Sequence, residues 1–135
     1  MTLCERVWDD LVGRYGADIR AVIRYHPIEY EERMRDDVRA QYTDSDVQSF
    51  VDEAIVNQLS LESKVDAVDL GPFHGLVRIF DDAWVLVWPD SLDEKSGFLV
   101  TLQRENSSVG IDAMEDIDAH LSEEIEPRIP AVQSV

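Results

Sequence analysis

The chain has 135 residues, of which 29 are acidic and 12 are basic, so its formal net charge is -17. This length suits one domain with a substantial hydrophobic core. The negative balance disfavours nucleic acid as a partner, because phosphate binding needs a cationic stripe that this sequence lacks. The sequence also lacks a basic amphipathic helix, so we expect no membrane partner.

The charge also predicts the environment. Lys64 and Lys95 are the two lysines among the twelve basic residues. Repulsion between so many carboxylates is tolerable where salt shortens the Debye length to about 3 Å, near 1 M. We therefore expect a halophilic, archaeal protein whose fold weakens in low salt. Cys4 is the single cysteine, and no leader or long apolar run is evident, so we expect a reducing, cytoplasmic location.

The first half of the chain predicts a helix and a hairpin. Thr2 and Glu5 have capping-box spacing ahead of a helical apolar pattern over residues 3–15, and Gly16 ends it. Residues 19–25 then alternate with a period of two, and residues 28–35 do so again after His26-Pro27. In the first of these strands, one face is predicted to carry Ile19, Ala21, Ile23 and Tyr25, and the other Arg20, Val22 and Arg24. Residues 36–42 are polar and predict a turn or a short helix.

The second half predicts a long helix, three strands and a last helix. Thr43 or Asp44 caps a helical apolar stripe that reaches about residue 65. Strands are expected over residues 73–80, 83–88 and 97–104, and a helix over 111–125 stops before Pro127. The order α-β-β-α-β-β-β-α predicts an α+β fold in which helices cover one antiparallel five-stranded sheet. The domain is expected over residues 1–126, with a flexible tail over 127–135.

Two resemblances accompany this prediction. The element order is similar to that of the roadblock and longin group, whose small domains dimerise and act as scaffolds for partners. The segments RDDVRAQY (35–42), GPFHGLVRIFDDAWVLVWP (71–89) and KSGFLVTL (95–102) resemble a family of short, uncharacterised haloarchaeal proteins. The second resemblance supports halophily and implies no particular chemistry.

The sequence predicts no catalytic, cofactor-binding or metal-binding residue. His26, His74 and His120 lie in a turn, at a strand start and in a helix, and no pair has short metal-ligand spacing. Adjacent carboxylates are frequent, but in so acidic a chain adjacency indicates a hydrated surface rather than an acid-base pair. Common nucleotide, hydrolase and metalloprotease motifs are absent from the sequence.

Two segments depart from the acidic background and are predicted as partner surfaces. Residues 20–39 contain as many arginines as acids, and alternation places Arg20, Arg24, Arg33 and Arg35 together on one face of the hairpin. These arginines form either cross-strand ion pairs or a partner-binding face. Residues 83–88 are apolar on both faces, so Trp84 and Trp88 belong either to the core or to a dimer seam.

From these features we expect a non-enzymatic interaction or regulatory module that forms a homodimer and binds an unidentified protein. The alternative is a small-molecule sensor or small enzyme with a pocket between sheet and helices, to which Tyr25, His74 and Arg78 could contribute. A transcription accessory factor is the third interpretation.

Overall fold

The computed structural model describes residues 1–65, 70–91 and 93–130, without the side chains of residues 60–65. The helices of this part of the chain are α1 (Leu3–Tyr15), α2 (Asp36–Gln41), α3 (Asp44–Val65) and α4 (Ile111–His120). The strands are β1 (Ile19–Tyr25), β2 (Tyr30–Met34), β3 (Leu76–Ile79), β4 (Ala83–Ser91) and β5 (Ser96–Gln103). The predicted α+β fold is confirmed, and the polar segment after β2 is the short helix α2.

The strands form one antiparallel five-stranded sheet in the order β2-β1-β5-β4-β3. The longer strands β1, β4 and β5 each have two neighbours, whereas β2 and β3 are short edge strands. Gly97, on β5, lies so close to its neighbours that a Cβ there would stand 2.6 Å from both the Trp88 carbonyl oxygen and the Tyr25 hydroxyl. The tight β4–β5 junction therefore requires glycine at this position.

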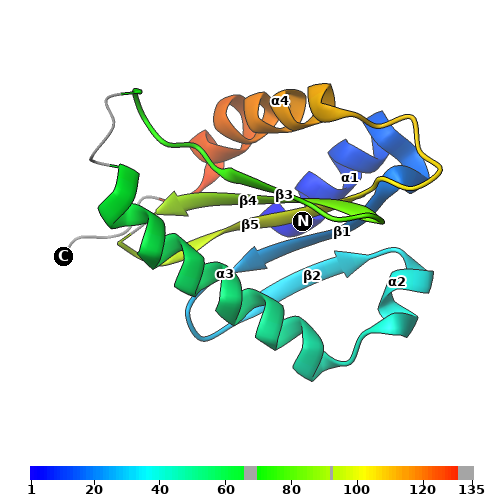
Figure 1. Ribbon diagram of the computed structural model, residues 1–135, viewed down its shortest axis with the longest axis horizontal. Helices are drawn as coiled ribbons and strands as arrows, with labels where there is room; N and C mark the ends of the chain where they lie inside the picture. The colour runs from blue at the N-terminus through cyan, green and yellow to red at the C-terminus, as the bar shows by residue number, and fades with distance from the viewer. Residues whose placement is uncertain (66–69, 92, 131–135) are drawn as a thin grey trace.

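Helices cover both faces of the sheet, which gives three layers (Figure 1). On one face α1 and α4 pack against the alternate side chains Leu86, Trp88, Phe98, Val100 and Leu102. On the other face the long helix α3 packs through Val47, Val51 and Ala54 against Ile23, Tyr25, Val85, Val87 and Leu99, and the short α2 lies beside its start. One face therefore has two covering helices and the other has one long helix.

The caps of α1 and α3 form as their residues predict. The Thr2 hydroxyl accepts the Glu5 amide at the start of α1, and Gly16 ends that helix with a φ of 60°. At the start of α3, the Thr43 hydroxyl accepts the Asp46 amide while the Asp46 carboxylate accepts the Thr43 amide. This reciprocal pair is a capping box and fixes where α3 begins.

A β-bulge changes the predicted faces of β1. The pairing of β1 with β5 shifts register between Ile19 and Ala21, and one inserted residue moves the side chains before it to the opposite face. Ile19 therefore packs with Val22 beneath α1 and α4, while Ala21 lies on the α3 side. The prediction that Ile19 and Ala21 share a face is wrong for this reason.

The chain remains in contact with the core beyond residue 126. After α4 it continues as a π turn (Leu121–Ile125) and a 3-10 turn (Glu126–Arg128). Ile125 is fully buried and Ile129 packs against the core. Of the predicted tail, residues 131–135 lie outside the described residues. No helix in the described part of the chain is long and apolar enough to cross a membrane.

Candidate functional site

The α3 face of the sheet contains a pocket of about 640 Å³ near the start of α3. It lies where β1 and β4 begin and β5 ends, and α2 and the first turns of α3 form its wall. Tyr42 and Phe80, 48% and 46% exposed, contribute to its lining. The apolar lining residues are Ala21, Ile23, Met34, Val38, Val47, Phe50, Phe80, Ala83 and Val85.

The pocket exists because the strands carry short side chains beneath this part of α3. Ala21 on β1 pairs with Thr101 on β5, and Ala83 on β4 lies at the same end of the sheet. Two residues further along β1, the longer side chain of Ile23 lies beside Leu99 of β5 and Val87 of β4, and these three occupy the space under α3. The change from large to small residues therefore leaves the pocket unfilled.

Polar groups line the pocket on two sides. Arg20 and Thr101 lie at the sheet, while Asp46, Asp81 and Asp82 line it from the helix and from the β3–β4 turn. Within the described residues Arg20 forms no ion pair, and its guanidinium donates one hydrogen bond to the Gln103 side chain, at 3.3 Å. Arg20 therefore retains donors for an acceptor group placed in the pocket.

The other three predicted arginines each lie in a different environment, away from the pocket position of Arg20. Arg24 is buried, ion-paired with Asp90 at 2.5 Å, and stacked over Phe98 at 4.8 Å. Arg33 faces α1 and pairs with Glu5 at 2.6 Å. Arg35 pairs with Asp37, and the guanidinium beside it lowers the pKa of the Asp37 carboxyl. Arg20, Arg24, Arg33 and Arg35 therefore do not form one continuous face.

The two tryptophans also differ. Trp88 is 3% exposed and donates from Nε1 to Asp118, which also contacts His74. Trp84 is partly buried beneath the guanidinium of Arg104, 5.3 Å from the ring centroid. Trp88 completes the core under α4, so Trp84 is the tryptophan with surface left for a partner.

The polar groups considered for a pocket from sequence alone are not gathered there. The Tyr25 hydroxyl donates to the Gln58 side chain beneath α3, at 2.7 Å. His74 contacts Asp118 of α4, and Arg78 pairs with Glu53 of α3. The pocket lining instead includes Arg20 and Thr101, which come together because the bulge at the start of β1 turns Arg20 toward the α3 side.

A family model described as a domain of unknown function, DUF7522, matches residues 5–122. The chain belongs to this family. The match runs from α1 into the π turn, so it includes all five strands and every lining residue of the pocket. No curated protein and no solved structure matches the chain.

The buried Arg24–Asp90 pair should contribute to stability as a unit. Removing one partner leaves the other charge buried without compensation, so Arg24→Met and Asp90→Asn should each lower the free energy of unfolding by about 3–5 kcal/mol. The double variant should lose clearly less free energy of unfolding than the sum of the two single losses. Urea unfolding in molar KCl measures these values. The control is Arg33→Met, at a half-exposed pair, which should lose about 1 kcal/mol or less. Strictly additive losses would contradict this assignment.

Proposed function

We propose that this protein is a non-enzymatic regulatory module that binds a small organic molecule in the pocket beside α2 and α3. The observation that carries the proposal is a set of short side chains in the sheet floor of a 640 Å³ pocket: Ala21 and Thr101, which pair across β1 and β5, and Ala83 on β4. Pockets of this size with apolar walls and a few polar groups are typical of small-molecule sites.

The lining indicates the ligand's chemistry. An apolar body fits against Ile23, Val47, Phe50 and the other apolar walls. Arg20 and Thr101 favour a hydrogen-bond acceptor, such as a carboxylate, at the end that meets the sheet. The lining carboxylates Asp46, Asp81 and Asp82 lie on the helix and turn sides of the pocket, so the ligand's carboxylate is placed on the Arg20 side. In brine, salt screens repulsion from the rest of the molecule beyond a few ångströms. The proposed ligand is therefore an apolar carboxylic acid.

Binding of naphthoate, with naphthylmethanol as its uncharged counterpart, tests this proposal by fluorescence titration in molar KCl. Thr101→Phe fills the floor and should weaken both probes by about tenfold or more, since the pocket volume is lost. Arg20→Met should weaken naphthoate by about tenfold while changing naphthylmethanol little, because a hydrogen bond to a charged group contributes about 1.5–3 kcal/mol.

Val56→Phe is the control, since Val56 is exposed on α3 and is not among the pocket-lining residues. Its affinity for both probes should equal that of the unmodified protein. Equal binding by Thr101→Phe, once its fold is verified by circular dichroism, would show that the pocket does not hold the ligand.

A second candidate function, an interaction module that pairs with a second copy of itself, is favoured by the β3 edge. The β2 edge carries Glu31, Glu32 and Arg33, which guard it against pairing, whereas β3 contains a single charged residue, Arg78. Ile79 and Phe80 are 59% and 46% exposed at the end of β3. The similarity of element order to roadblock and longin domains, which dimerise, supports the same proposal.

Light scattering in molar KCl should give a dimer mass for the unmodified protein. Ile79→Lys should give a monomer, because it places an ammonium group at the proposed junction, and Val56→Lys should leave the dimer intact as the matched surface change. A monomeric unmodified protein, or a dimer that persists in Ile79→Lys, would argue against pairing through β3.

The working environment proposed for this module is the salt-rich cytoplasm of a halophilic archaeon. Its support is the net charge of -17 and the near absence of lysine. In the described structure, most arginines are engaged by carboxylates, for example Arg14 with Asp116 and Arg78 with Glu53. Most of the excess carboxylates are therefore screened by ions from the solvent rather than by arginines.

Cys4 offers a direct measurement of this salt dependence. It is 1% exposed, and burial followed by repulsion from Glu31 raises the pKa of its thiol to about 12, so the reactive thiolate is suppressed in the folded state. Alkylation by iodoacetamide near pH 8 should be slow in molar KCl. It should approach the rate measured in urea as KCl is diluted to millimolar. A rate that stays slow in nearly salt-free buffer would contradict the brine proposal.

A further inference from the structure

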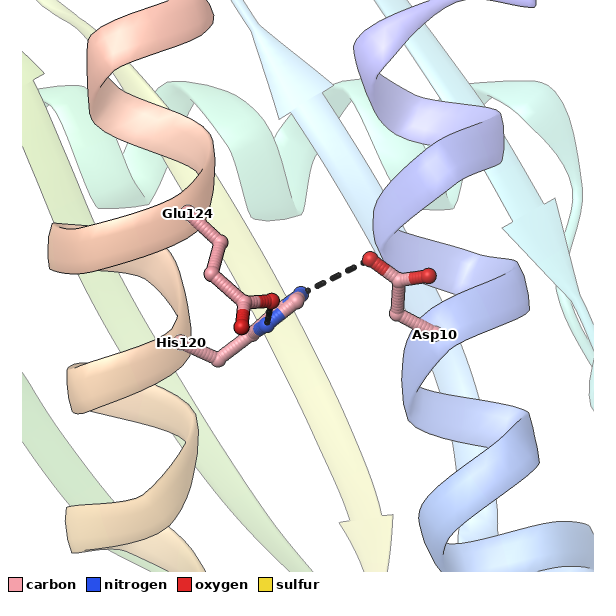
Figure 2. Close-up of side chains that lie close together, drawn as sticks. All are labelled: Asp10, His120 and Glu124. Carbon is pink, nitrogen blue, oxygen red and sulfur yellow. Dashed lines mark ion pairs between the residues drawn. The ribbon is translucent and has the colours of Figure 1, made fainter.

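His120 lies buried at the seam between α1 and α4. Its side chain is 0% exposed, yet it is flanked by two carboxylates from different elements. Figure 2 shows the imidazole between Asp10, which projects from α1, and Glu124, which projects from the π turn that follows α4. The seam therefore brings together one nitrogen donor and two oxygen donors, distant from the pocket on the opposite face of the sheet.

One ring nitrogen of this histidine lacks a hydrogen bond. Nε2 lies 3.1 Å from an Asp10 oxygen, within ion-pair distance, but it has no partner in hydrogen-bonding alignment although it is buried. Nδ1 lies 2.6 Å from a Glu124 oxygen and 3.3 Å from Nη2 of Arg14. Buried polar atoms are almost always satisfied, so a buried, unpartnered nitrogen beside a carboxylate is a candidate donor to a ligand.

The spacing of the donors suits one ion. One oxygen from each carboxylate and one ring nitrogen lie within 4.8 Å of one another. A tetrahedral metal with bonds of about 2.0–2.2 Å holds its donors about 3.3–3.6 Å apart. The carboxylates can close this difference, because Asp10 and Glu124 keep 32% and 54% of their side chains exposed.

The surrounding charges also permit a cation. Arg14 is engaged by Asp116 at 3.1 Å, and the same carboxylate accepts the Tyr15 hydroxyl. Arg6 pairs with Asp10 at a longer 3.6 Å. Arg14 also lies 3.8 Å from Glu124. Asp10 and Glu124 thus each have a long ion pair with an arginine, and their two negative charges would bind a divalent ion more closely, at the roughly 2.0–2.2 Å of a metal bond. The π turn that carries Glu124 also favours a binding site here, because such turns are frequent at functional sites.

We propose that Asp10, His120 and Glu124 bind one divalent transition-metal ion, of the zinc class. An imidazole donor favours Zn²⁺ over Mg²⁺ and Ca²⁺, which prefer oxygen donors throughout. Three protein ligands leave a fourth position of a tetrahedral ion for water. The ion would join α1 to the end of α4, and this inference does not depend on the ligand pocket.

Calorimetric titration with Zn²⁺ in molar potassium nitrate, which avoids competing chloride, tests the proposal. The protein should bind one equivalent above the weak background of its surface carboxylates. Asp10→Asn and Glu124→Gln should each reduce that affinity at least as much as the roughly 10- to 100-fold lost when an outer-shell partner of a metal site is removed.

Asp9→Asn and Glu123→Gln are the matched controls. Each removes the same charge from the neighbouring exposed residue on the same turn, and each should leave the affinity unchanged. Equal affinity in all four variants would assign the binding to the diffuse acidic surface and overturn the proposal. A second readout is the nitrogen NMR spectrum of the histidine rings with Co²⁺, which should perturb His120 before the exposed His74; perturbation of His74 alone would also overturn it.

Discussion

The structure depends on how much of a sheet a helix can cover. Five strands spaced about 4.8 Å apart make a sheet roughly 24 Å wide, whereas a helix with its side chains is about 10–12 Å in diameter. Two helices, α1 and α4, span one face, but α3 alone cannot span the other. The second face is therefore closed where its strands carry large residues beneath α3 and remains open where they carry small ones. The pocket follows from this unequal coverage.

The charged side chains are distributed differently in the interior and at the surface. Single arginines form ion pairs with single carboxylates. Arg24 neutralises Asp90 in the interior, and Arg33 neutralises Glu5 beside α1. The planar guanidinium suits this purpose, because it binds a carboxylate through two donors and stacks on an aromatic ring, as on Phe98. Few basic groups then remain to balance the outer acids, which leaves a strongly anionic surface.

Much of the fold could be predicted from the sequence, because capping residues and the periodicity of apolar side chains indicate the helices and strands directly. Thr2 and Gly16 delimit α1, Thr43 starts α3, and the period-two alternation predicts β1 at its exact bounds. The bulge at Arg20 could not be predicted, since an inserted residue leaves the alternation of apolar side chains nearly intact. That one residue decides which face Arg20 and Ile19 occupy, and so it decides the polar lining of the pocket.

The candidate metal ligands illustrate a different limit of prediction. His120 and Glu124 are spaced i, i+4 in one helical segment, and this signal is present in the sequence. Asp10 is 110 positions away, and only the packing of α1 beside α4 brings it to the imidazole. Long-range partners of this kind are set by tertiary structure, so a spacing search within one segment finds at most two of the three.

The segment after α4 shows that a recognisable family unit and a folding unit need not end at the same residue. The family match stops at residue 122, within the π turn. Ile125 is fully buried, and Ile129 still packs on the core. An expression clone that stops at residue 122 would lack Ile125 and Ile129 and expose the apolar residues that they cover, so a clone that keeps this core intact should extend to about Pro130.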